Sequence, residues 1–180
     1  MFIRALALFS LLLTSTFTLG LESDANSEIT IESDRAAFDR KVGTAVYVGN
    51  VILKQGSLLI EADKITLYSD DQQQLKKAIA LGKPARFQQQ MEESKGLTKA
   101  RGQKITYLTQ DKTVTLLEDA ELEQEGNSFN GNQIIYDMVN ESIKAKGGTN
   151  TSVPATSNNT PPSGRIKMII QPAKPAEASQ

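Results

Sequence analysis

Apolar and polar residues alternate along much of the chain after residue 40, and this alternation predicts strands rather than helices. Residues 44–55 read TAVYVGNVILKQ and residues 113–124 read TVTLLEDAELEQ. The first segment is rich in β-branched and aromatic residues, and the second has the same extended character. A two-residue period of this kind is typical of a strand with one buried face. Both segments are therefore predicted to be strands.

The two predicted strands are related by an internal duplication. Thr44 matches Thr113 and Gln55 matches Gln124, which gives an offset of 69 residues. A second pattern, in the order small, amide or acid, polar or basic, apolar, any and apolar, begins at residues 33, 62, 102 and 131. Its first and third copies, and its second and fourth copies, are also 69 residues apart. Because two independent comparisons give one offset, the sequence predicts a doubled β unit.

The start of each copy of this second pattern predicts a tight corner. Short polar side chains bond back to their own backbone, and small residues tolerate unusual backbone dihedrals. Each unit is therefore predicted to be a strand, a corner and a second strand. Pro84 lies in a weaker copy of the strand pattern at residues 81–88. Because proline has no backbone N–H to donate, it predicts a sheet edge or a break in pairing there.

One face of the predicted strands is apolar in both halves of the duplication. Tyr47 and its counterpart Leu116 share this face, whereas Glu121 has the opposite parity and is predicted to face water. The predicted apolar lining consists of Phe38, Tyr47, Val51, Leu53, Leu58, Ile60, Ile65, Leu67, Phe87, Ile105, Tyr107, Leu116, Leu122, Phe129, Ile134 and Tyr136. Periodicity alone favours an ordinary sandwich core over a surface that lines a ligand site.

Residues 1–25 have the pattern of an export signal. Arg4 precedes an almost wholly apolar or hydroxylated stretch from Ala5 to Leu19, and charge resumes only at Glu22. The stretch is shorter than the roughly 20 residues that a membrane-spanning helix needs, so a cleaved signal is favoured over an anchor. Small residues permit cleavage after Gly20 or after Ala25. The sequence leaves that choice open.

Composition divides the rest of the chain into four parts. The predicted β domain covers residues 26–147. Residues 148–164 are dense in Ser, Thr, Asn, Pro and Gly and predict a flexible loop. Residues 165–172 alternate briefly before Pro172 and predict one closing strand. Residues 173–180 are predicted to be a disordered tail.

Composition also removes several classes of function. The chain has 180 residues, which fits one domain, and it contains no histidine, cysteine or tryptophan. The usual general base near neutral pH, the thiol nucleophile, the soft metal ligands and every disulfide are therefore excluded. A net charge of −1 and an aromatic content of 6% argue against nucleic acid as a partner. We expect no catalytic residues, no metal and no cofactor.

Several segments occur in a fixed order along the chain. The export signal is followed by TAVYVGNVILKQGSLLIEADKITLY, GKPARFQQQ, GQKITYLTQDKTVTLLEDAELEQ and GNQIIYD. This order resembles the periplasmic bridge proteins of lipopolysaccharide transport in Gram-negative bacteria, the LptA/OstA-like family. The resemblance runs from about Ile29 to Gly147, and residues 165–172 look like the closing strand of that family. The insertion at residues 148–164 departs from the compact family pattern.

The resemblance implies an all-β, single-domain antiparallel β-jellyroll in the periplasm, open at both ends. Its apolar interior would shield the acyl chains of lipid A, which makes the predicted lining a set of lipid-binding candidates. The implied partners are lipopolysaccharide, the inner-membrane-tethered jellyroll protein of the transport complex, the outer-membrane lipopolysaccharide assembly protein and further copies of the chain stacked head to tail. No catalysis is implied.

An open sheet leaves unpaired backbone groups on its terminal strands, and these can recruit the next subunit. The residues that we expect in the pairing strands are Ile29, Ile31, Ile166, Met168 and Ile170. An alternative function stays open, namely a structural or adhesive periplasmic β-repeat domain that binds only protein and has a filled core.

Overall fold

A computed structural model describes residue 24 and residues 27–90, 96–148 and 164–172. The predicted export signal apart from Asp24, the predicted loop between residues 149 and 163 and the predicted tail therefore lie outside the described residues. No helix among the described residues is long and apolar enough to cross a membrane.

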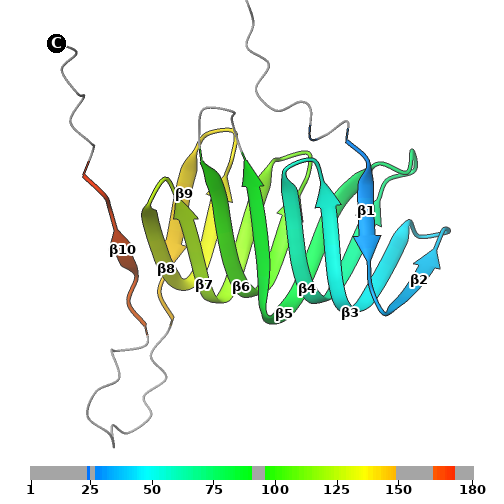
Figure 1. Cartoon of the computed structure of the whole chain (residues 1–180), viewed down its shortest axis with the longest axis horizontal. Helices are drawn as coiled ribbons and strands as arrows, with labels where there is room; N and C mark the ends of the chain where they lie inside the picture. The colour runs from blue at the N-terminus through cyan, green and yellow to red at the C-terminus, as the bar shows by residue number, and fades with distance from the viewer. Residues whose placement is uncertain (1–23, 25–26, 91–95, 149–163, 173–180) are drawn as a thin grey trace, which may run out of the picture.

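The described residues form one antiparallel sheet of ten strands (Figure 1). The strands are β1 (Ile29–Glu32), β2 (Arg35–Asp39), β3 (Thr44–Gln55), β4 (Leu58–Ser69), β5 (Leu75–Gln90), β6 (Leu97–Leu108), β7 (Thr113–Gln124), β8 (Asn127–Asp137), β9 (Ser142–Lys146) and β10 (Lys167–Ile169). Their order in the sheet is β1-β3-β4-β5-β6-β7-β8-β10, while β2 pairs with β3 and β9 pairs with β8. The sheet does not close on itself, so the predicted all-β jellyroll open at both ends is confirmed.

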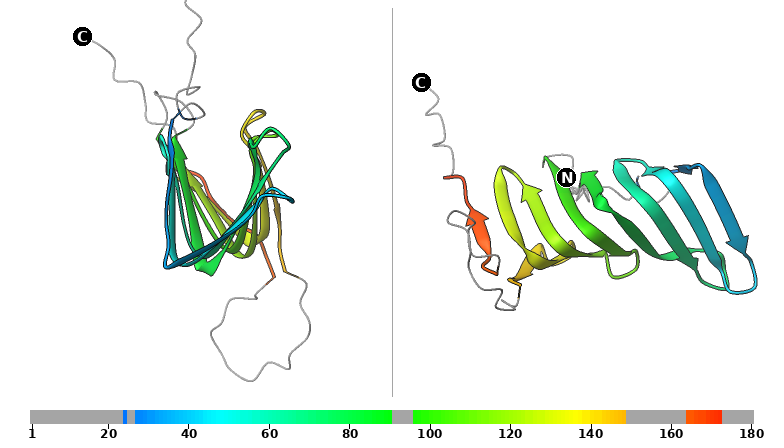
Figure 2. Two further views of the ribbon diagram at one scale, coloured as in Figure 1. Left: turned by 90° about the vertical axis from the view of Figure 1, so that its right-hand side faces the viewer. Right: turned by 90° about the horizontal axis from the view of Figure 1, so that it is seen from below.

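The sheet is bent along a line across its long strands, which gives it the V-shaped section seen in Figure 2. We call its two arms the β1 wall and the β2 wall, the bend the corner, and the opening between the free ends of the walls the mouth. The β1 wall contains β1, β10 and residues 51–55, 58–62, 85–90, 97–102, 120–124 and 127–131; the β2 wall contains β2, β9 and residues 44–48, 64–69, 75–81, 104–108, 113–117 and 133–137.

The corner lies at the four copies of the second sequence pattern, as predicted. In three of these copies, however, it lies inside a continuous strand rather than between two strands. The pairing register shifts between Glu61 and Lys64 in β4, and between Arg101 and Lys104 in β6. Only at residues 33–34 does the corner separate two strands, β1 and β2. Small residues are needed here, because a β-carbon on Gly102 would lie 3.0 Å from the carbonyl oxygen of Leu117. The long strands are therefore bent rather than broken.

Pro84 interrupts pairing without marking an edge. It lies in β5, a strand with neighbours on both sides, and it falls at the register shift between Leu81 and Ala85. The missing N–H therefore coincides with the corner, where the ladder is already interrupted. Of the two predicted possibilities, the break in pairing is correct and the sheet edge is wrong.

The duplication is visible in the backbone itself. The register shift between Val48 and Val51 in β3 recurs between Leu117 and Ala120 in β7, 69 residues later. Residues with left-handed φ also recur at that offset, in the pairs Gly43 and Lys112, Gly49 and Glu118, Asn50 and Asp119, and Gly56 and Glu125. The predicted doubled unit is therefore confirmed, down to the turn and corner geometry.

Candidate functional site

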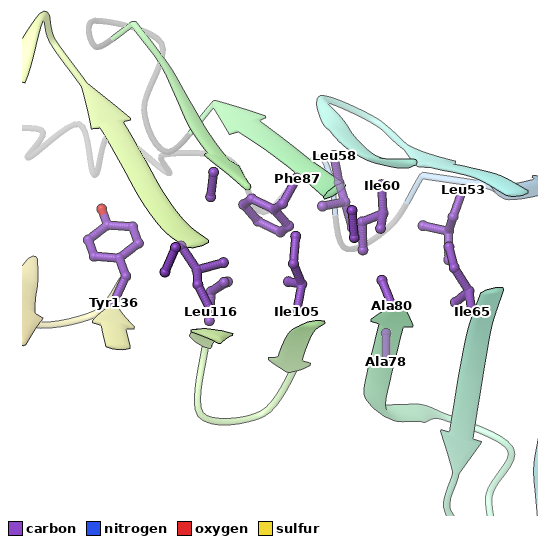
Figure 3. Close-up of a cluster of buried hydrophobic side chains, with 14 of the residues drawn as sticks. Leu53, Leu58, Ile60, Ile65, Ala78, Ala80, Phe87, Ile105, Leu116 and Tyr136 are labelled. Atoms are coloured by element: carbon purple, nitrogen blue, oxygen red, sulfur yellow. The ribbon is translucent and has the colours of Figure 1, made fainter. Parts of the chain in front are cut away.

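Apolar side chains of both walls point toward one another across the space between the walls (Figure 3). In this view Leu53, Leu58 and Phe87 from the β1 wall face Ile65, Ile105 and other residues of the β2 wall. The buried cluster comprises Val51, Leu53, Leu58, Ile60, Ile65, Leu67, Ala78, Ala80, Ala85, Phe87, Ala100, Ile105, Val114, Leu116, Ala120, Leu122, Ile134 and Tyr136. All of these are at most 8% exposed. The interior is an apolar layer with packed side chains.

Fifteen of the sixteen residues predicted to line the interior belong to this cluster or pack against it. Tyr47, Tyr107 and Phe129 are partly buried and contact the cluster, while the other twelve are members of it. Phe38 is the exception, with 67% of its surface exposed. It lies on the inner face, opposite Ala45 and edge-on to the ring of Tyr47 at 5.7 Å, but its strand β2 is the last of its wall. Phe38 therefore lacks a neighbour on one side.

The sequence reasoning missed the small members of the interior. Ala78 and Ala80 in β5 are 2% and 1% exposed, and Ala85 is fully buried. In the same strand Leu81, which is larger and more apolar than alanine, is 40% exposed. Hydrophobicity alone therefore favours Leu81 as the inward-facing residue in the part of β5 before the corner, whereas Ala78 and Ala80 are the residues that face the interior. The inner face of β4 could have identified these alanines, because residues opposite each other on paired strands share a face and Ala80 lies opposite Ile65.

A ring contact and a hydrogen bond join side chains of the two walls across the interior. The rings of Phe87 in the β1 wall and Tyr107 in the β2 wall lie 5.8 Å apart and edge to face. In the second half of the duplication, Gln124 Nε2 donates a hydrogen bond to the hydroxyl of Tyr136 at 3.1 Å. Burial raises the pKa of Tyr107, and the nearby carboxylate of Asp24 raises it further. The walls are thus held together by side chains, whereas backbone pairing runs within each wall.

A buried polar group lies at the mouth end of the β1 wall. The carboxylate of Asp24 accepts hydrogen bonds from the backbone and hydroxyl of Ser57 and from the side-chain amide of Gln89. Gln89 is paired in register with Thr98, which is fully buried. Within the described part of the chain, Thr98 Oγ1 and Gln89 Oε1 have no hydrogen-bond partner. This buried polar cluster was not predicted, because the sequence pattern does not indicate whether a polar residue in a strand is buried or exposed.

Two hollows on the surface of the described residues lie outside the apolar interior. One of about 800 Å³ is bordered by corner residues such as Lys83 and Asn132. A smaller one of about 240 Å³ lies over the outer face of the β1 wall, where Arg101 forms an ion pair with Glu121. Both are lined largely by charged or polar side chains. No group of Asp and Glu residues that could hold a metal is found among the described residues.

Each end of the sheet presents two short strands with an unpaired outer edge. β1 and β2 lie at one end, and β9 and β10 at the other. Of the predicted pairing residues, Ile29, Ile166, Met168 and Ile170 are 40 to 67% exposed, and Ile31 packs partly against the interior. The predicted closing strand forms as β10 and pairs with β8, over fewer residues than the predicted 165–172. The sequence did not indicate that β2 and β9 would form a second pair of edges.

Comparison with known proteins places this arrangement among transport components. The family described as "LptA/(LptD N-terminal domain) LPS transport protein" matches residues 30–142. The lipopolysaccharide export system protein LptH of Pseudomonas aeruginosa is 36% identical over 165 residues, which cover 92% of this chain and 91% of LptH. The corresponding LptA of Haemophilus influenzae is 30% identical over 152 residues, which cover 83% of this chain and 88% of that protein.

A solved structure is also similar. It is the crystal structure of LptH, described as the LptA homologous periplasmic component of the conserved lipopolysaccharide transport device of Pseudomonas aeruginosa. The TM-score is 0.70 at 35% sequence identity, and the match covers 83% of this chain and 99% of the other. Sequence and fold therefore agree over most of both chains.

Proposed function

The chain belongs to the family of LptA and the LptD N-terminal domain, the lipopolysaccharide transport proteins, and on this basis we propose that it is a periplasmic bridge protein for lipopolysaccharide. In this role it binds the acyl chains of lipid A between its two walls and leaves the sugars and phosphates in water. It carries lipopolysaccharide from the inner toward the outer membrane without catalysing a reaction.

The observation that carries this proposal is the apolar interior of a sheet that stays open at both ends. Burial of each methylene is worth about 0.8 kcal/mol, so one acyl chain of about a dozen carbons costs about 10 kcal/mol to expose to water. An apolar layer that continues through a row of open subunits would cover several such chains throughout the crossing.

Lipid binding requires the packed walls to separate. Two features support such a motion: register shifts interrupt the backbone ladder at the corner, and the contacts described across the interior are between side chains. The corner then acts as a hinge. An acyl chain that enters between the walls exchanges one set of apolar contacts for another, so the opening exposes little hydrocarbon to water.

Stacking of subunits follows from the directions of the end strands. β10 runs from the corner toward the mouth and β1 runs from the mouth toward the corner, so the two can pair antiparallel between neighbouring copies. Met168 lies opposite Phe129, and Ile31 lies opposite Leu53. Leu53 matches Leu122 in the duplication, and Leu122 pairs with Phe129, so Ile31 and Met168 lie at the same distance from the corner. This geometry supports a register between copies in which Met168 pairs with Ile31 and Lys167 pairs with Glu32.

The β2 wall supports the same stacking direction. Phe38 lies opposite Ala45, and Ile143 in β9 lies opposite Tyr136. Residue 45 matches Val114, which pairs with Tyr136, so Phe38 and Ile143 occupy the same level of the wall. In the stack, Ile143 of one copy covers the exposed ring of Phe38 in the next. The membrane-tethered jellyroll protein and the outer-membrane assembly protein would bind these same edges.

The experiment that tests the proposal is lipid capture. The protein is purified from the periplasm of a lipopolysaccharide-producing cell, extracted with organic solvent and examined for lipid A by mass spectrometry. Co-purified lipid A is the expected result.

The filled interior favours a second candidate, a structural or adhesive domain that binds only protein. Absence of lipid A, both from the isolated protein and after incubation with lipopolysaccharide, would favour that candidate.

A further inference from the structure

Asp24 is part of the folded domain, although it precedes the first strand. Only 7% of its surface is exposed. Its Oδ1 accepts a hydrogen bond from the backbone N of Ser57 at 2.8 Å, and its Oδ2 accepts bonds from the hydroxyl of Ser57 and from Gln89 Nε2. The carboxylate therefore links the turn between β3 and β4 to the end of β5.

The turn between β3 and β4 leaves space for this carboxylate. Gly56 has φ of +57°, and a β-carbon at that position would lie 2.0 Å from Asp24 Oδ1. The equivalent residue in the second half of the duplication is Glu125, with φ of 51°. A side chain is thus compatible with this backbone conformation where no carboxylate occupies the space. Glycine at position 56 is explained by the proximity of Asp24 as well as by its own backbone.

The backbone connects Asp24 to the start of the sheet. The backbone N of Ser27 donates to the carbonyl oxygen of Asp24 at 3.1 Å, and Gln55 Nε2 donates to the carbonyl oxygen of Ser27 at 3.3 Å. The first bond closes a turn within this segment, and the second holds the segment against the mouth end of β3. Removal of Asp24 would leave the backbone N–H of Ser57 and the amide of Gln89 without this acceptor, and buried donors without acceptors destabilise a fold.

From these contacts we infer that the export signal is removed upstream of Asp24, at the Gly20–Leu21 bond, and that the mature chain begins with Leu21. This inference rests on the proposed function, because it requires export to the periplasm. Hydrolysis of the bond by the signal peptidase consumes one water and leaves a carboxylate on Gly20 and an α-amino group on Leu21. Cleavage after Ala25, the other site with small residues, would discard Asp24.

The start of the mature chain tests the inference directly. The full precursor is expressed in a Gram-negative host, and the periplasmic protein is analysed by N-terminal sequencing and intact mass. A start at Leu21 is expected, and a start at Asn26 would overturn the inference while leaving export intact. An uncleaved precursor that stays in the cytoplasm would overturn the inference and, separately, the periplasmic role.

Stability measurements test the role of the carboxylate independently of processing. Protein that starts at Asn26 should melt about 4 °C or more below protein that starts at Leu21, since the loss of even one buried bond shifts a domain of this size by a few degrees. Asp24→Ala in the longer form should reproduce that loss. Asp71→Ala, on an exposed turn, is the matched control and should leave the melting temperature unchanged. Equal melting temperatures for the two starts would refute the structural role of Asp24.

A double variant examines the space around Gly56. Gly56→Ala should lower the melting temperature more in the wild-type background than in Asp24→Ala, because the carboxylate that the new methyl group would meet is then absent. Fully additive effects would contradict the steric part of the inference.

Discussion

Gln124 and Tyr136 connect the two walls by a hydrogen bond of 3.1 Å, from the last residue of β7 to a hydroxyl on the opposite side of the interior. Gln124 belongs to the β1 wall and Tyr136 to the β2 wall, and they face each other because they lie at similar distances from the corner. A separation of the walls must break this bond. It is therefore a direct probe of the proposed opening.

Tyr136→Phe removes the hydroxyl and leaves the apolar ring in place. We expect a loss of about 1 kcal/mol in the free energy of unfolding, together with faster amide hydrogen exchange near the mouth in β7 and β8. Lipid loading should become faster. Tyr68→Phe, in the β2 wall, is the control, since the ring of Tyr68 stacks under Lys77. Unchanged exchange in Tyr136→Phe would mean that this bond does not hold the mouth closed.

A charge in the interior should weaken lipid capture. Leu122→Asp places a carboxylate among fully buried apolar side chains, and Phe87→Asp does the same near Tyr107. The matched control is Leu81→Asp, because Leu81 points outward and is 40% exposed. Circular dichroism must show that each variant stays folded. If folded Leu122→Asp retains as much lipid A as Leu81→Asp, lipid does not occupy this part of the interior.

The proposed stacking register pairs Lys167 with Glu32 of the next copy. Lys167→Glu should weaken concentration-dependent elongation, as measured by light scattering, since like charges opposite each other destabilise strand pairing. Combining it with Glu32→Lys should restore elongation. Lys112→Glu, on an exposed turn, is the control for a change in net charge. Protein that remains monomeric at high concentration, with and without residues 165–180, would contradict the stacking itself.

Tyr107 makes stability sensitive to alkaline pH. Its pKa in the folded protein is raised above 10.0, first by burial and second by Asp24. The neutral phenol is therefore favoured by folding, so its contribution is complete below pH 10.0 and is lost as pH rises through the folded-state pKa. Between pH 9 and pH 11.5 the melting temperature should fall more steeply in the wild type than in Tyr107→Phe. Parallel curves would show that Tyr107 ionises equally in both states.

Thr98 should be replaceable by an apolar residue of similar shape at a gain in stability. Its hydroxyl is fully buried and has no partner among the described residues, so it is desolvated without compensation. We expect Thr98→Val to raise the free energy of unfolding by about 1 kcal/mol in a urea titration. Thr106→Val, on the outer face of β6, is the comparison and should have a smaller effect. Destabilisation by Thr98→Val would indicate that the hydroxyl is hydrogen-bonded in solution.

Local pattern predicted the strands, the corners and most of the inner face, because each depends on neighbours in the sequence. Ala78 and Ala80 were missed because β5 changes its inner parity at the corner, and the larger Leu81 obscured the change. Phe38 was assigned to the correct face, but its exposure depends on β2 being a terminal strand. Whether the walls touch depends on how sharply the whole sheet bends, and no short segment of sequence encodes that angle.

The corners of β3 and β7 have a consequence for how this protein can change over evolutionary time. In each strand the register shift spans two residues, Gly49–Asn50 or Glu118–Asp119, so Tyr47 and Val51 share one side of β3. Deletion of a single residue there would rotate the remaining half-strand by half a turn, which would expose Val51 and Leu53 to solvent and bury Lys54. Insertions and deletions at these two bends should therefore survive selection only in even numbers.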